Sequence, residues 1–140
     1  VRSLVGSEMC IRDRYYYFHN CVYESVWKDN RRRTKERYEI NDIINKYSSD
    51  YKLIFVGDAT MAPYEITNAG GSIEHWNEEP GGLWIKRLCS HFTSVAWLNP
   101  IQDDHWDYTS SVCILRDLVE KRMFPLTLKG LEDAMSNLSK

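Results

Sequence analysis

Asp58 is the residue of this sequence whose type and position point most directly to chemistry. It follows Gly57 and the run at 52–56, KLIFV, which is typical of a strand buried on both faces of a sheet. Ligands of open parallel sheets bind beyond the carboxyl ends of the strands. A carboxylate there could face Mg²⁺, which prefers oxygen ligands, and Thr60 could add a hydroxyl. The alternative is that Asp58 only caps the next turn, and the residues alone favour neither.

Polar residues follow the other predicted strands as well. His19 and Asn20 follow the first strand, and Asn99 follows a later one. The tract at 74–79, EHWNEE, lies in the long loop after Asp58, and DDHWD at 103–107 follows Asn99. We expect these residues at the sheet edge that carries Asp58, where a partner or a substrate would meet them.

The sequence shows none of the common catalytic motifs. It has no GxSxG nucleophile elbow and no glycine-rich phosphate loop. Its four histidines lack the spacing of a zinc site. We therefore expect a protein that is not an enzyme. The rival interpretation is a metal-dependent hydrolase or phosphotransferase that uses Asp58 with His75 or His105.

The composition is that of an ordinary folded domain. Of 140 residues, 43% are apolar and 13% aromatic, whereas disordered segments are poor in aromatics. The formal charge of −2 gives no reason to expect nucleic acid as a partner. No run approaches the roughly 18 apolar residues of a membrane span. The absence of a recognisable secretory signal and of CxxC pairs indicates a cytoplasmic protein.

Hydrophobic periodicity predicts strands that alternate with helices, which is typical of a mainly parallel sheet with helices on both faces. The first two strands are expected to pair as an antiparallel β-hairpin. Strands are predicted at 15–19, 22–27, 52–56, 94–98 and 123–126, and helices at 40–47, 83–92, 108–119 and 128–138. The last two helices are expected to bury one stripe each: Tyr108, Val112, Leu115 and Val119, then Leu128, Leu131, Met135 and Leu138, with Thr127 as the final cap.

Residues 1–14, VRSLVGSEMCIRDR, differ in character from the rest of the chain. They lack clear amphipathic periodicity, and the string resembles a translated sequencing adapter that recurs at the ends of assembled reading frames. We therefore interpret residues 1–14 as a non-native leader. On this interpretation the protein itself begins near Tyr15, and residues 15–140 are part of a longer domain.

Residues 15–140 resemble bacterial von Willebrand factor type A domain proteins of the CoxE-like kind. The resemblance runs in the same order along nearly all of this range. The stretches that carry it are YFHNCVYE at 17–24, DNRRR at 29–33, YKLIFVGDATM at 51–61, PYEI at 63–66, HWNEE at 75–79 and WLNP at 97–100.

The resemblance implies a Rossmann-like fold with a metal-ion-dependent adhesion site, and a non-catalytic role in binding partners. Asp58 matches the family's Asp after the fourth strand, which holds a Mg²⁺ or Mn²⁺ ion through water. The implied partners are a MoxR-type AAA+ ATPase and a client protein, a metalloenzyme or complex under maturation. The residues expected to contact a partner are His19, Asn20, His75, Asn77, Glu78 and Asn99.

The sequence departs from this family in one respect. The family's first strand and its Asp-x-Ser-x-Ser loop should precede Tyr15, and no residues there match. Thr34 is the only threonine in the region of the family's second metal-site loop, so the resemblance makes Thr34 the candidate for the metal ligand that this loop supplies. We therefore expect a doubly wound α/β sheet that lacks its central strand, leaves two long edges unpaired, and binds the metal ion weakly or not at all.

Overall fold

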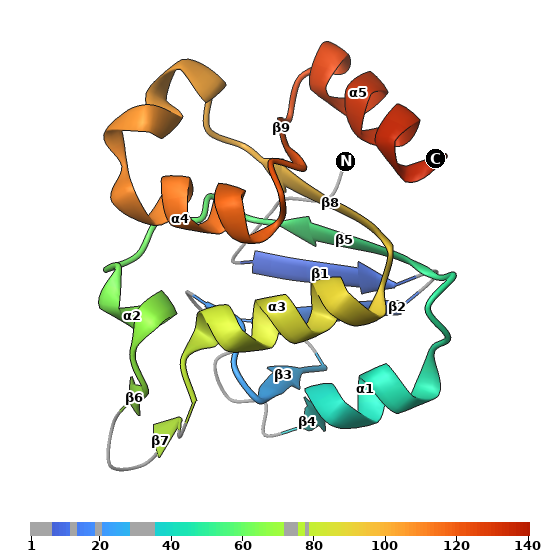
Figure 1. Cartoon of the computed structure of the whole chain (residues 1–140), viewed down its shortest axis with the longest axis vertical. Helices are drawn as coiled ribbons and strands as arrows, with labels where there is room; N and C mark the ends of the chain where they lie inside the picture. The colour runs from blue at the N-terminus through green and yellow to red at the C-terminus, as the bar shows by residue number, and fades with distance from the viewer. Residues whose placement is uncertain (1–6, 12–13, 19–20, 29–35, 72–75, 78) are drawn as a thin grey trace.

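A seven-stranded sheet lies at the centre of the chain in the computed structural model (Figure 1). The structure describes residues 7–11, 14–18, 21–28, 36–71, 76–77 and 79–140. The strand order is β4-β3-β2-β1-β5-β8-β9, and β6 and β7 form a separate small sheet. The elements are β1 (Ser7–Ile11), β2 (Arg14–Phe18), β3 (Ser25–Trp27), β4 (Arg37–Glu39), α1 (Ile40–Lys46), β5 (Lys52–Val56), α2 (Tyr64–Thr67), β6 (Gly70–Gly71), β7 (Trp76–Asn77), α3 (Gly81–His91), β8 (Ser94–Asn99), the 3-10 helix η1 (Asp103–Tyr108), α4 (Ser110–Leu118), β9 (Met123–Pro125) and α5 (Leu128–Leu138).

The sheet is mixed, with a parallel half. β5, β8 and β9 are parallel neighbours. β1 is antiparallel to both β2 and β5, so β2 runs in the same direction as that parallel half. β3 lies antiparallel between β2 and β4, with Tyr17 opposite Trp27. The predicted α/β class and the antiparallel pairing of the first two predicted strands are therefore confirmed. The prediction of a mainly parallel sheet was wrong, because four of the six pairings between the described strands of this sheet are antiparallel and two are parallel.

The expected gap in the sheet is not present. Residues Ser7–Ile11 form β1 and occupy the position between β2 and β5 that was predicted to be empty. Within this strand Met9 and Ile11 are fully buried, because alternate residues of a strand point to the same face and these two point into the main core. The prediction of two long unpaired edges was therefore wrong.

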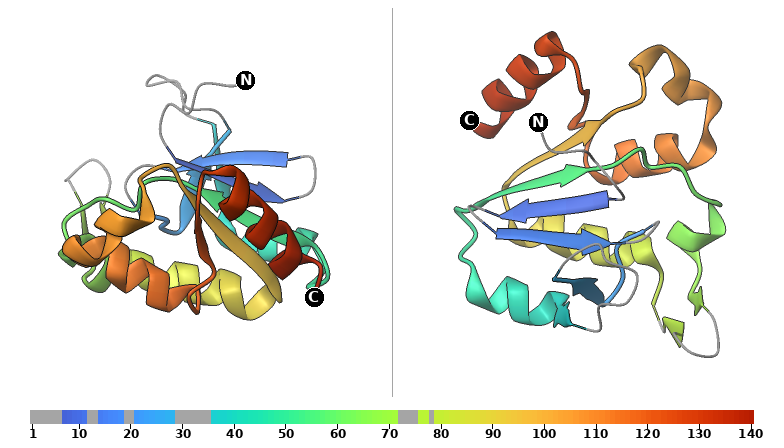
Figure 2. Two further views of the ribbon diagram at one scale, coloured as in Figure 1. Left: turned by 90° about the horizontal axis from the view of Figure 1, so that it is seen from above. Right: turned by 180° about the vertical axis from the view of Figure 1, so that it is seen from behind.

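The main core lies on one face of the sheet, under α1, α3 and α4 (Figure 2). Leu53 and Phe55 of β5 and Val95 and Trp97 of β8 point into it and are all but inaccessible to solvent. The helices contribute the buried residues Ile40, Ile43, Trp84, Ile85, Leu88, Val112 and Leu115. None of the helices in the described part of the chain has the length and apolar composition required to cross a bilayer.

α5 covers the opposite face of the sheet, over β8 and β9. Ala96 of β8 packs there in a smaller cluster with Ala134 and Leu138 of α5. Thr127 caps the helix as predicted, because its side-chain oxygen accepts a hydrogen bond from the Gly130 nitrogen at 3.0 Å. A side chain at position 130 would collide with the Pro125 carbonyl group, so glycine lets α5 approach β9 closely.

Most of the predicted apolar stripe of α5 is not buried. Leu128 is 79% exposed, Met135 63% and Leu131 39%, and only Leu138 is buried as expected. The residues that face the sheet are Gly130, Ala134 and Leu138, spaced four apart. The prediction was wrong because the small residues Gly130 and Ala134 permit a closer contact with the sheet than the large residues would.

Tyr108 is a second correction. It is 87% exposed, because it ends η1 rather than opening the helix that follows. The other three residues of that predicted stripe, Val112, Leu115 and Val119, are buried as expected.

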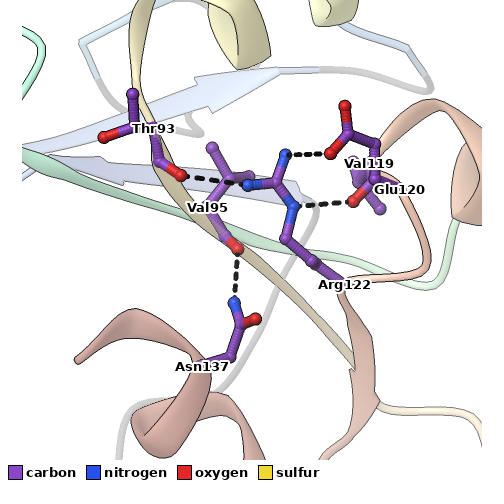
Figure 3. A network of polar contacts seen from close by, with 6 residues as sticks. All are labelled: Thr93, Val95, Val119, Glu120, Arg122 and Asn137. Atoms are coloured by element: carbon purple, nitrogen blue, oxygen red, sulfur yellow. Dashed lines mark hydrogen bonds and ion pairs between the residues drawn. The ribbon is translucent and has the colours of Figure 1, made fainter. Parts of the chain in front are cut away.

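Arg122 ties the end of α4 to the start of β8 (Figure 3). Its guanidinium donates hydrogen bonds to the carbonyl oxygens of Val119 at 2.9 Å and Thr93 at 3.1 Å, and it lies 3.9 Å from Glu120. Asn137 of α5 donates to the Val95 carbonyl at 3.0 Å. β9 pairs only with the last three residues of β8. The bonds to the Thr93 and Val95 carbonyls therefore satisfy backbone groups at the start of β8 that β9 does not reach.

Candidate functional site

The segment 57–61, called here the Asp58 loop, leaves the carboxyl end of β5 and is held by three side chains of the core. The carbonyl oxygens of three consecutive residues each accept a hydrogen bond: Gly57 from the Trp97 indole at 2.9 Å, Asp58 from the Asn99 amide at 3.0 Å, and Ala59 from the Ser111 hydroxyl at 2.8 Å. Because buried polar groups bonded in this way rarely shift, the path of the loop is strongly determined.

Asp58 itself is exposed at the surface of this loop. Its Oδ1 atom accepts a hydrogen bond from the Thr60 nitrogen at 2.9 Å, and the Thr60 hydroxyl donates to the Asp58 carbonyl at 3.4 Å. Ala59 between them has a positive φ of 60°, which is uncommon for a residue with a side chain. The carboxylate therefore caps its own turn and still faces solvent.

Three aromatic rings pack against one another in the core next to the Asp58 loop. Phe55 and Trp97 are stacked with centroids 4.9 Å apart, and Phe18 of β2 meets both rings edge-on at 6.4 and 6.2 Å. Such offset and edge-to-face pairs stabilise beyond the area that they bury. They also fix the orientation of the Trp97 indole, whose N–H holds the Gly57 carbonyl.

Asn99 lies at the predicted edge of the sheet, but it has a different role from the one expected. Its side chain is fully buried. Besides donating to Asp58, it accepts a hydrogen bond from the Ile101 nitrogen at 2.9 Å. The direct contact with a partner predicted for Asn99 is therefore replaced by a role in positioning the Asp58 loop.

Ser111 is a residue of the site that the sequence reasoning missed. It is 1% exposed on the second position of α4, and its hydroxyl also accepts a hydrogen bond from the Met61 nitrogen at 3.2 Å. The signal in the sequence was a serine directly beside Val112, on the buried side of a predicted helix. A buried hydroxyl requires a hydrogen-bond partner, and here the partner is the loop.

The residues that the structure describes do not fit a Mg²⁺ or Mn²⁺ site by themselves. Among them, no three His, Cys, Asp or Glu side chains gather closely enough to hold a metal ion. One oxygen of Asp58 is already used by the Thr60 nitrogen, and the Thr60 hydroxyl is directed back to its own turn. Thr34, the other predicted metal ligand, lies outside the described residues.

Most of the predicted partner-binding residues also lie outside the described residues: His19, Asn20, His75 and Glu78. Asn77 forms part of β7, which pairs with β6. Glu79, two residues after Asn77, makes a two-point salt bridge with Arg87 of α3. In this salt bridge Arg87 Nη2 donates to Glu79 Oε1 at 3.1 Å, and Nη1 bonds the other carboxylate oxygen. The hydrogen bond from Arg87 lowers the pKa of the Glu79 carboxyl. This pair connects the end of the 74–79 tract to α3.

His105, the second histidine of the rival enzyme interpretation, lies on η1 beyond the end of β8. It is exposed, and its Nε2 atom lies 3.6 Å from Asp104. The following Trp106 is buried and donates from its indole to the Ile101 carbonyl at 2.9 Å. Trp106 anchors this short helix, while the ionisable side chains beside it point to solvent.

Cys21 is a buried thiol and not an activated nucleophile. It is 2% exposed, and burial raises its pKa to about 12. The thiolate is the reactive form of cysteine, so a raised pKa suppresses reactivity. Its sulfur lies directly against the backbone of Gly81, where an added side chain would collide with it. Cys21 therefore packs the segment between β2 and β3 against the start of α3.

Comparisons of the chain with protein-family models, with curated proteins and with solved structures find no match.

Proposed function

We propose that this chain is a non-catalytic partner-binding module, of the von Willebrand factor type A, CoxE-like kind that its sequence resembles. The observation that carries the proposal is the Asp58 loop, an exposed carboxylate on a backbone held by Trp97, Asn99 and Ser111. A carboxylate positioned in advance of binding loses little conformational entropy when a partner contacts it. The module acts in the cytoplasm with a MoxR-type AAA+ ATPase and a client protein.

The finer description of the fold belongs to the same proposal. A Rossmann-like, doubly wound arrangement accounts for the common direction of β2, β5, β8 and β9. It also accounts for the position of Asp58 beyond the carboxyl end of β5 and of Asn99 at the carboxyl end of β8, the edge at which such sheets bind their ligands. The proposal relies on the Asp58 carboxylate and on the loop that holds it, without a metal ion.

The metal-dependent enzyme is the weaker alternative. A hydrolase of that kind needs several ligands and a base that converge on one point. In the described part of the chain, His105 lies beside Asp104, and no group of three metal-binding side chains includes Asp58. Neither observation favours catalysis over binding.

Binding of a purified MoxR-type AAA+ ATPase, measured by calorimetry, tests the proposal. Asp58→Asn removes the charge and keeps the shape, and we expect it to weaken binding about tenfold or more, because charged groups at an interface centre are costly to remove. Asp42→Asn is the matched control, since Asp42 is exposed on α1. Equal affinity of the wild type and Asp58→Asn would contradict the proposal.

A further inference from the structure

A groove of about 320 Å³ lies between α2, α3 and α4, on the helical side of the sheet. Its walls are largely apolar and include Ile66 of α2, Leu83 of α3, and Ile114 and Leu118 of α4. A volume of this size is at the lower end of the range found for specific ligand sites. It is suited to one or two large apolar side chains rather than to an extended ligand.

Gly82 makes the groove possible by bringing three helices together. A Cβ atom at this position would lie 2.9 Å from the Ile66 carbonyl oxygen and 3.3 Å from Leu118 Cδ1. These distances are too short for ordinary packing, so only glycine lets α3 begin this close to α2 and α4. The walls of the groove are thus parts of one packed unit.

Lys86 gives the groove its charge. It is the one charged residue among the described residues that line the groove. It is exposed one turn after Gly82 on α3, and it forms no salt bridge within the described part of the chain. An apolar cavity with an unpaired ammonium group at its rim is complementary to an apolar group that carries a neighbouring negative charge.

Two elements of the chain connect the groove to the Asp58 loop. Ser111, which holds the loop, precedes Ile114 of the groove by three residues of α4, about 4.5 Å along the helix axis. α2 begins six residues after Asp58 and brings Ile66 to the groove. The groove and the Asp58 loop therefore share α4 and the segment that leads from β5 into α2.

We propose that the groove seats a leucine or phenylalanine side chain of an acidic segment of the partner protein, with a carboxylate of that segment paired to Lys86. This inference rests on the proposed function, because it assigns the same partner a second point of contact. The apolar anchor supplies most of the affinity, and the exposed ion pair supplies orientation and a smaller gain.

Two synthetic peptides test the chemistry directly on the ¹⁵N-labelled full chain. The probes are the acetylated, amidated tetrapeptides Glu-Leu-Phe-Glu and Lys-Leu-Phe-Lys. Each peptide is titrated into the labelled protein, and binding is followed by NMR chemical shifts. We expect the acidic peptide to shift the amide signals of Leu83, Ile114 and Leu118, and to bind at least fivefold more tightly than the basic one. Lys86→Glu should reverse this preference. Equal binding of both peptides, or shifts elsewhere on the chain, would overturn the proposal.

Matched variants separate the groove from general surface effects. Lys86→Gln should lower the affinity for the acidic peptide about fivefold, which is the limit for one exposed ion pair. Leu83→Gln should lower the same affinity about tenfold. The controls are Lys52→Gln, on the exposed start of β5, and Leu128→Gln, at an exposed position of α5. Neither control should change binding. Controls that weaken binding as much as the groove variants would contradict the proposal.

The same variants measured against the MoxR-type ATPase distinguish the two proposals. Weaker binding after Asp58→Asn and also after Lys86→Gln supports both. If only Asp58→Asn weakens binding of the ATPase, the proposed function stands and the groove is not a second contact with that partner. An ATPase that does not bind the wild type refutes the proposed function, and the peptide titration then decides the groove by itself.

Discussion

Replacement of Asn99 by alanine is the most direct test of how the Asp58 loop is held. The Asn99 amide joins two segments, because it donates to the Asp58 carbonyl at 3.0 Å and accepts from the Ile101 nitrogen at 2.9 Å. The alanine variant loses both hydrogen bonds and the weaker contact from the amide nitrogen to Met123 Sδ at 3.6 Å, and it leaves a small cavity at a fully buried position. The loop should therefore become both less stable and less well positioned.

The size of the effect follows from the surroundings of the two bonds. A typical hydrogen bond contributes about 1 kcal/mol net, and a buried group left without a partner costs about 1 to 3 kcal/mol. Asp58 and Ile101 are themselves exposed, so water can replace part of each lost bond. We therefore expect about 1 kcal/mol for each bond and about 1 kcal/mol for the cavity, or about 3 kcal/mol in total.

Urea unfolding followed by tryptophan fluorescence and circular dichroism measures this loss. Asn137→Ala is the control, since Asn137 makes one partly buried bond to the Val95 carbonyl and should cost about 1 kcal/mol. Hydrogen exchange at the Thr60 and Met61 amides should accelerate in Asn99→Ala and stay unchanged in the control. A loss below about 1 kcal/mol for Asn99→Ala, with unchanged exchange, would refute this account of the loop.

Three further predictions concern other parts of the molecule. Burial raises the pKa of Cys21 to about 12, while the unfolded thiol ionises near pH 8.5. Above about pH 9 the unfolded chain therefore binds fewer protons than the folded chain, and the free energy of unfolding should fall as the pH rises. In urea titrations at several pH values, Cys21→Ser should remove the contribution of this thiol to the pH dependence. Gly130→Ala should destabilise the folded protein by about 1 to 2 kcal/mol, because overlap with the Pro125 carbonyl outweighs the better helix propensity of alanine. In the same thermal-unfolding measurement, the control Ser136→Ala, on the exposed side of α5, should change stability little. Calorimetric titration with Mg²⁺ or Mn²⁺ should show weak binding or none, and tight binding that Asp58→Ala abolishes would instead favour the metal-dependent enzyme.

The alternation of strands and helices could be predicted from the sequence, because it depends on local patterns. The run KLIFV predicted β5 with the bounds that the structure shows, and the helix predicted at 40–47 corresponds to α1, in which Ile40 and Ile43 are buried. Thr127 was correctly predicted as a cap, since capping requires only a hydroxyl at the right distance from the first turn. These features need no information about distant parts of the chain.

The position of the candidate site was also accessible from the sequence. Asp58 and Asn99 each follow an apolar run, and parallel strands bring such ends to one edge. The structure confirms that they meet there, through the bond from the Asn99 amide to the Asp58 carbonyl. The strand pattern does not show, however, which of the two side chains points to solvent.

Only the tertiary structure decided how faces and partners are assigned. Asn99 is buried and Asp58 exposed because Trp97 and Asn99 lie on the inner face of β8, whereas Asp58 lies on a loop beyond β5. Met9 and Ile11 enter the core because pairing with β2 and β5 buries them. α5 packs on the sheet through Gly130 and Ala134, because close approach to β9 requires small residues. Each outcome depends on contacts between residues far apart in the sequence, which local periodicity does not encode.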